Sequence, residues 1–217
     1  MRRTTLTQGQ VVDAAISLLD QEGPAGLNMR ALGQALDCAA TAVYWHVGSK
    51  LALIELVCDQ AWGEIALPML PAGDWREAAT SLATEANCMF RRHPWVVELF
   101  GTVPTFSLNK ARYDECALTV YEEAGFKGRE ADYAAAAVFT YVLGHALGNA
   151  AEQSLRRADA ATTTRRSQPD AAAWNEILSD LPRLRARVAA GADSAEAPQG
   201  SFDYGLERLL EGLESHR

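Results

Sequence analysis

Histidine and cysteine are the side chains best suited to catalysis or metal binding, and this 217-residue chain has four of each. The histidines form no His-Glu-x-x-His or Glu-x-x-His pair: His46, His93, His145 and His216. The cysteines form no Cys-x-x-Cys and lack a histidine at zinc-ligand spacing: Cys38, Cys58, Cys88 and Cys116. A Gly-x-Ser-x-Gly elbow and a phosphate-binding glycine loop are also missing from the sequence. We therefore expect no catalytic centre, no metal and no cofactor.

Side chains suited to another kind of chemistry are concentrated between residues 28 and 50. Small residues at Ala40 and Thr41 would let a helix backbone approach base edges, and the threonine hydroxyl can bond a base or touch a thymine methyl. Tyr44 and His46 carry polar tips suited to phosphates. Lys50 would share a phosphate with the free amides of a helix start. This pattern indicates DNA recognition, although the same residues would also serve as caps and core of a plain helical bundle.

Local sequence patterns predict the helices that position these residues. Thr7-Gln8-Gly9-Gln10 has the form of a capping box, and Gly23-Pro24 ends the helix that follows it. Asn28 is a good N-cap for a short second helix, and residues 37–39 predict a tight turn before a short third helix. Gly48 ends that helix, and Ser49 caps a fourth that runs to about residue 65. Two short helices joined by a tight turn, with a supporting helix before them, predict a helix-turn-helix.

Composition places the whole chain among all-α globular proteins. It is 48% hydrophobic and 22% charged, and no run of alternating residues predicts a strand. No stretch approaches the ~20 apolar residues of a membrane span, and the start lacks the apolar core of a signal peptide. We expect a cytoplasmic protein with no membrane partner.

A cluster of Pro68, Pro71 and Gly73 predicts the boundary between two domains. Residues 1–66 would form the DNA-binding domain, in which the fourth helix, from about 49, is the connector. Residues 67–217 would form a larger helical domain for ligand binding and dimerisation, with a long helix over about 130–156. We expect residues 157–200 to be loose apart from a helix around Trp174 to Val188, and a last helix to follow.

Two strings in the first domain carry a resemblance to a known family. Leu27-Asn28-Met29-Arg30-Ala31-Leu32-Gly33-Gln34-Ala35-Leu36 precedes Ala42-Val43-Tyr44-Trp45-His46-Val47-Gly48-Ser49-Lys50-Leu51-Ala52-Leu53. Over about residues 7–66 the chain resembles the TetR family of transcriptional repressors, nearest to its tetracycline-repressor branch. Looser landmarks from Trp75 to Gly212 extend the likeness to the second domain. The DNA contacts predicted from the residues and the resemblance are Arg30, Ala40, Thr41, Tyr44, Trp45, His46 and Lys50.

The resemblance implies a homodimer that binds a near-palindromic, double-stranded operator and is released by a small-molecule effector. Small residues on the long helix and an apolar stripe on the last one are the predicted dimer contacts: Gly144, Gly148, Phe202, Leu206, Leu209 and Leu213. The stripe would also suit the core of a monomer, although the dimer contact is the favoured interpretation. Aromatic residues and two polar ones are the predicted effector contacts: Phe90, Trp95, Phe100, Phe106, Tyr113, Phe139, His145 and Asn149. Many of these would also suit an ordinary core.

The chain departs from the tetracycline repressor at its drug site. Thr140 and Gly148 stand where the resemblance places a histidine and a glutamate, and Ala66 stands where a drug-binding histidine is expected. These departures argue against tetracycline as the effector, and the aromatic composition of the second domain favours a more apolar or aromatic ligand. Two alternatives stay open at this point: a helical ligand-binding protein or enzyme without specific DNA binding, and a DNA-binding regulator without a ligand.

Net charge is an objection to DNA binding that the structure must answer. The chain carries −8, and residues 1–63 hold four basic groups against six acidic ones. Within residues 27–50 the balance is +1, from Arg30 and Lys50 against Asp37. We expect the other acids to face away from DNA and non-specific binding to be weak. Arg2 and Arg3 would add to it only if they form an arm that reaches the duplex.

Overall fold

The computed structural model describes residues 6–100, 107–161, 176–191 and 197–215, and these are helical with no extended strand. The first four helices are α1 (Gln8–Glu22), α2 (Met29–Ala35), α3 (Ala40–Val47) and α4 (Lys50–Gly63). The next four are α5 (Trp75–Arg92), α6 (Pro94–Leu99), α7 (Leu108–Glu123) and α8 (Arg129–Ala161). The last two are α10 (Pro182–Gly191) and α11 (Ala197–Glu214). The expected all-α fold is confirmed.

Caps fix the starts of the N-terminal helices where the sequence predicts them. The Thr7 hydroxyl accepts from the Gln10 amide while the Gln10 side chain accepts from the Thr7 amide, which completes the capping box. Asn28 accepts from Ala31 N at 2.9 Å, and Ser49 accepts from Ala52 N at 3.0 Å. Each cap satisfies an amide that the helix itself leaves free. Fully buried residues of all four helices then form a shared core, among them Val11, Leu32, Val43 and Leu53.

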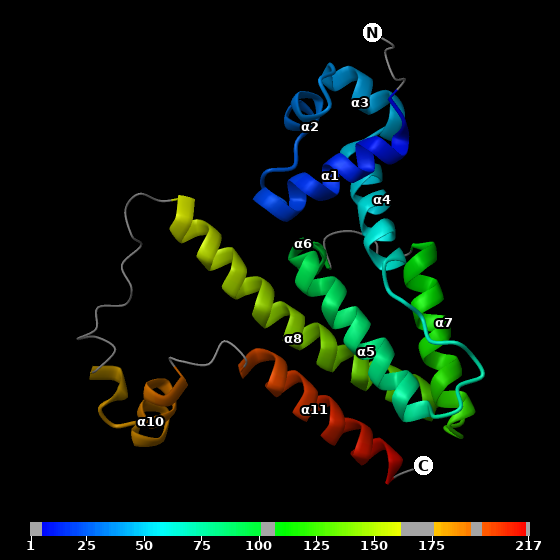
Figure 1. The fold of residues 1–217 in the computed structure, drawn as a ribbon, viewed down its shortest axis with the longest axis vertical. Helices are drawn as coiled ribbons and strands as arrows, with labels where there is room; N and C mark the ends of the chain where they lie inside the picture. The colour runs from blue at the N-terminus through cyan, green and yellow to red at the C-terminus, as the bar shows by residue number, and fades with distance from the viewer. Residues whose placement is uncertain (1–5, 101–106, 162–175, 192–196, 216–217) are drawn as a thin grey trace.

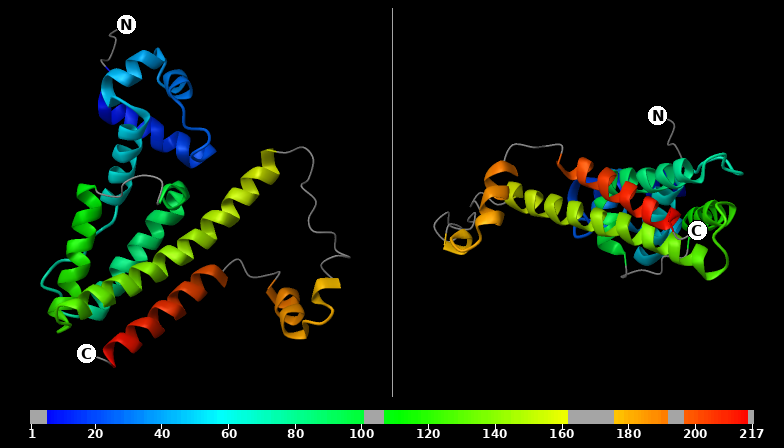
Figure 2. Two further views of the ribbon diagram at one scale, coloured as in Figure 1. Left: turned by 180° about the vertical axis from the view of Figure 1, so that it is seen from behind. Right: turned by 90° about the horizontal axis from the view of Figure 1, so that it is seen from below.

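Helices α5, α7 and α8 form the centre of the remaining structure, and α11 lies beside α8 (Figures 1 and 2). The buried face of α5 includes alanines at Ala79, Ala83 and Ala86, whose small side chains let neighbouring helices pack closely. Pro94 starts α6 directly after His93, so α5 and α6 are separate helices that meet at this proline. Helix α8 begins one residue before the predicted 130–156 and ends five residues after it.

Helix α4 connects the two parts of the molecule. Figure 1 shows it leaving the α1–α3 bundle and ending beside α7 and near the C-terminal end of α5, where Trp62 meets Phe90. The expected helix around Trp174 to Val188 is found instead as α10, and Trp174 lies outside the described residues. Figure 2 shows α10 standing apart from the other helices. By length and composition alone α8 would be able to cross a membrane, which for one helix is weak evidence.

Candidate nucleic-acid interface and effector cavity

A sharp turn between α2 and α3 sets the geometry of the helix-turn-helix. Asp37 adopts a positive φ of 50°, which a short polar side chain tolerates better than most. Gly33 makes the turn possible, since a Cβ there would lie 2.7 Å from the Cys38 carbonyl oxygen. The predicted tight turn at 37–39 is therefore confirmed, and it brings α3 across α2 at one end of the molecule (Figure 1).

Helix α3 buries one face and leaves large side chains in solvent on the other. Val43 and Val47 are buried, whereas Trp45 is 89% exposed and Tyr44 is 46% exposed. A tryptophan this exposed has no packing role within the chain, and such residues mark surfaces that bind another molecule. Thr41 is exposed as well, and Ala40 and His46 are half-buried. The structure therefore brings the predicted α3 contacts together on or beside one surface.

Arg30 and Lys50 flank this surface from the neighbouring helices. Arg30 is exposed in the first turn of α2, and Lys50 is the exposed first residue of α4. Since the Ser49 cap leaves other α4 amides free, a phosphate there would meet both the ammonium and the helix start. The Gln8 side chain donates to the His46 carbonyl oxygen at 3.0 Å, which ties α1 to the end of α3.

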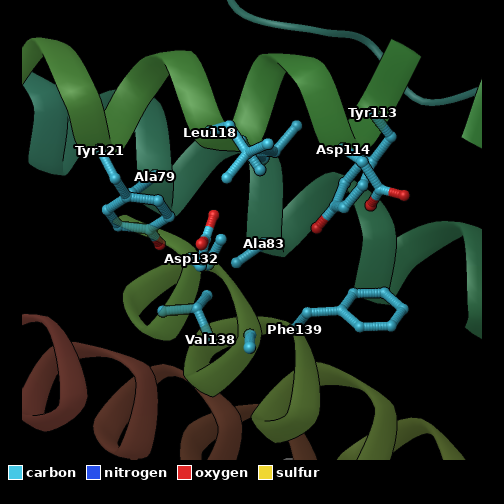
Figure 3. Close-up of a pocket in the computed structure, with 13 residues that line it drawn as sticks. Ala79, Ala83, Tyr113, Asp114, Leu118, Tyr121, Asp132, Val138 and Phe139 are labelled. Carbon is cyan, nitrogen blue, oxygen red and sulfur yellow. The ribbon is translucent and has the colours of Figure 1, made fainter. Parts of the chain in front are cut away.

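A partly open cavity of about 240 Å³ lies between α5, α7 and α8 (Figure 3). Its residues are mostly alanines, aliphatics and aromatic rings, with two carboxylates among them: Ala79, Leu82, Ala83, Tyr113, Asp114, Ala117, Leu118, Tyr121, Asp132, Ala135, Ala136, Val138 and Phe139. Burial raises the pKa of Tyr113 and of Tyr121, so both hydroxyls stay protonated. The cavity therefore offers an apolar body with a few polar groups, as small-molecule sites do.

Aromatic rings continue from one side of this cavity to the end of α4. Trp62 of α4 lies 5.3 Å from Tyr113 and 6.2 Å from Phe139 between ring centroids. It also meets the Phe90 ring edge-on at 5.6 Å, and Phe100 lies 6.1 Å from Phe139. These distances lie within the ~4.5–7 Å range of favourable ring pairs. The cavity wall and the connector helix thus share one packed cluster.

The predicted effector contacts are divided among several places. Tyr113 and Phe139 line the cavity, while Phe90 and Phe100 lie behind its wall. His145 and Asn149 line a separate hollow of about 180 Å³ with Arg91, Glu152, Gln153, Arg156 and Gln199, and they contact each other at 3.2 Å. Phe106 lies outside the described residues. The two carboxylates of the cavity, Asp114 and Asp132, were not predicted.

Trp95 requires a correction, because it is fully buried and is not among the residues that line the cavity. Its indole N–H donates to Asp20 Oδ1 of α1 at 2.7 Å. The neighbouring His93 places Nδ1 2.8 Å from the same carboxylate and Nε2 3.2 Å from Glu64 at the end of α4. Arg157 of α8 donates to the Asp20 carbonyl oxygen at 3.1 Å. These contacts join the DNA-binding helices to α6 and α8, and no local sequence pattern predicts them.

The predicted dimer contacts also need correction in part. Phe202 and Leu206 are 0% and 2% exposed, because α11 turns them onto α8, where Phe202 stacks on Tyr141 with centroids 5.6 Å apart. They belong to the core of one subunit, and Leu209 and Leu213 are half-buried beside them. Gly144 and Gly148 lie on the exposed face of α8, where an added Cβ would meet nothing within 4 Å.

Comparison with known proteins decides the family. A family model described as "Tetracyclin repressor-like, C-terminal domain" matches residues 67–217, and one described as "Bacterial regulatory proteins, tetR family" matches residues 11–57. The chain belongs to the TetR family. The TetR-family relatives include an HTH-type transcriptional regulator of Saccharopolyspora erythraea, 32% identical over 96% of this chain and 84% of its own length. The Escherichia coli class D tetracycline repressor protein is 31% identical over 96% of this chain and 89% of its own length.

Superposition on a solved structure also supports the TetR fold. A possible TetR-family transcriptional regulator from Streptomyces coelicolor A3(2) superposes with a TM-score of 0.76 at 26% identity, covering 97% of this chain and 100% of that one. The chain is thus a helix-turn-helix transcriptional regulator of the TetR family.

Proposed function

We propose that this chain is a cytoplasmic, homodimeric repressor that binds a near-palindromic operator through α3 and is released by a small molecule bound between α5, α7 and α8. The observation that carries the proposal is the exposed aromatic surface on α3, set in a helix-turn-helix and flanked by Arg30 and Lys50. The role proposed is binding and regulation, without catalysis. The class D relative is named a tetracycline repressor, which favours repression over activation.

The packing around Trp62 supplies the coupling between effector and operator. A molecule entering the cavity contacts Tyr113 and Phe139, and both rings pack on Trp62 in the last turn of α4. Asp59, nearly one turn earlier on α4, accepts from the Asn109 amide at 2.8 Å at the start of α7. A shift of α7 or of Phe139 would therefore be passed to α4 and change the spacing of the two α3 helices in the dimer. Operator and effector would weaken each other by the same factor.

The exposed apolar face of α8 supports the dimer. Tyr133 is 63% exposed, Leu147 56% and Leu155 61%, and Gly144 and Gly148 lie between them. Tyr204 of the neighbouring α11 is 68% exposed. Small residues between large apolar ones let a second helix approach closely, and so large an apolar face is unusual on a monomer. A two-fold dimer through this face would present two α3 helices to one operator, with half-sites ~34–36 Å apart.

The first experiment is selection of bound duplexes from a random double-stranded library at about 150 mM salt. Wild type should enrich a short inverted repeat, and Tyr44→Ala should lose it, while Met69→Ala should not, since that 91% exposed side chain lies on the connecting loop. Lys50→Gln should flatten the log–log salt dependence of operator binding by about 1.8, from ~0.9 per phosphate contact in each subunit of the dimer. Enrichment of nothing above background by wild type, even at low salt, would refute operator binding.

A further inference from the structure

The charged side chains that line the cavity between α5, α7 and α8 are all negative. Its thirteen lining residues include two carboxylates, Asp114 and Asp132, and no lysine, arginine or histidine. An anionic guest would meet two carboxylates in this lining, of which Asp114 is paired with Lys110 from outside it. Asp114 is 53% exposed and Asp132 is exposed as well, so solvent screens part of the remaining repulsion.

A cation of the chain itself already lies against these aromatic walls. The ammonium of Lys110 is 4.7 Å from the centre of the Phe139 ring, 5.1 Å from Trp62 and 5.7 Å from Tyr113. It also donates to Asp114 Oδ2 at 2.6 Å, and its side chain is only 12% exposed. Three ring faces within about 6 Å of one charge make a cage of the kind that binds organic cations. The rings that line the cavity are thus oriented to stabilise positive charge.

Asp132 is the carboxylate that Lys110 leaves uncompensated. It has no ion pair with any residue the structure describes, and Figure 3 shows its oxygens directed into the cavity near Tyr121. Its position in the first turn of α8 stabilises its negative charge through the helix dipole. Glu130 shares that turn without lining the cavity, so a role at the helix start does not explain why Asp132 faces inward.

We propose that the effector is a small aromatic cation, with its rings between the α5 alanines and the faces of Tyr113 and Phe139, and its positive group beside Asp132. This inference rests on the proposed role of the cavity as the effector site. The volume of about 240 Å³ lies below the ~300–1,000 Å³ usual for drug-sized ligands, which favours one or two rings. Charge and size together select this class from the apolar and aromatic molecules expected from the sequence.

Three probes of matched shape test the charge of the guest by isothermal titration calorimetry on the full chain. They are 1-methylquinolinium, its neutral isostere 1-methylnaphthalene, and the 1-naphthoate anion. The cation should bind at least about fivefold more tightly than the neutral probe, from one partly exposed ion pair and ring contacts, and the anion most weakly. Leu118→Trp should abolish the binding, since this half-buried side chain lines the cavity.

Asp132→Asn should reduce the preference for the cation over the neutral isostere to about twofold or less. Glu130→Gln is the matched control, because it removes the same charge from the same helix turn outside the cavity and should leave the preference unchanged. Equal or tighter binding of 1-methylnaphthalene or 1-naphthoate, or no binding of any probe, would overturn the inference of a cation. Operator binding is measured separately, so failure of the cation class and failure of the repressor function are distinguishable.

Discussion

Replacement of His93 tests the junction between the DNA-binding helices and the rest of the chain. Both ring nitrogens face carboxylates, Asp20 at 2.8 Å and Glu64 at 3.2 Å. The imidazole ring presents a separate nitrogen to each carboxylate. Glutamine carries its N–H donors on a single nitrogen, so it cannot occupy both positions. His93→Gln therefore removes at least one charge-assisted bond from a side chain that is 8% exposed.

The expected cost follows from the exposure of the two carboxylates. A hydrogen bond to a charged group contributes about 1.5–3 kcal/mol to stability. The side chains of Asp20 and Glu64 are 33% and 36% exposed, so we expect the bonds from His93 to lie toward the lower end of that range. We expect His93→Gln to lower the free energy of unfolding by about 2 kcal/mol. In urea that is a midpoint shift of about 0.7 M if the slope is ~3 kcal/mol/M. Protein concentration must be held fixed, since dimerisation adds to apparent stability.

Arg92→Gln is the matched control for this junction. Arg92 contacts the same Glu64, at 3.1 Å, but its side chain is 48% exposed, so its loss should cost less than about 1 kcal/mol. Equal losses for the two variants, or a His93→Gln midpoint within about 0.2 M of wild type, would show that the histidine does not hold the junction. Hydrogen exchange adds a local readout, because loosening the junction should speed exchange in α1 and α4 before the rest.

Three further predictions concern the second domain. Asn87→Leu should raise the free energy of unfolding by about 1–3 kcal/mol in thermal or urea denaturation, because both amide atoms of this fully buried residue lack a partner among the residues that the structure describes; no change would mean that bound water satisfies them. Leu147→Arg should shift the molecular mass in analytical ultracentrifugation from dimer to monomer, whereas Leu184→Arg on α10, at similar exposure, should not; a dimeric Leu147→Arg would move the interface elsewhere. Lys110→Met should tighten binding of 1-methylquinolinium severalfold in calorimetry, since it removes a positive charge that repels the cation and leaves Asp114 unpaired; weaker binding would show that the lysine supports the site.

The helix starts were predictable because capping is local. Thr7, Asn28 and Ser49 each bond an amide three residues away, so the sequence window that predicts the cap contains every atom involved. The helix-turn-helix follows from three such starts and from Gly33, whose missing Cβ lets the turn close. These features depend on residues near one another in the chain, and they position the predicted DNA contacts.

The cavity was less predictable because its residues come from three helices. Tyr113 and Phe139 have the helical spacing of ordinary core residues, and only their packing together shows that a space remains between them. Trp95 was placed in the wrong surroundings because its partner, Asp20, lies 75 residues earlier in the chain. Lys110 and Asp114, four residues apart, have the spacing of a routine surface ion pair. The sequence alone cannot show that the lysine lies under aromatic rings.

The acidic residues of the first domain answer the objection raised by net charge. Asp20 bonds Trp95 and His93, and Asp59 accepts from the Asn109 amide, so both face the second domain. Asp13 accepts from Gln60 between α1 and α4. Three of the six acids are thus engaged away from α3, where the exposed Tyr44 and Trp45 lie. Asp20 and Asp59, which argue against DNA binding in a count of charges, instead join the DNA-binding helices to the domain that would control them.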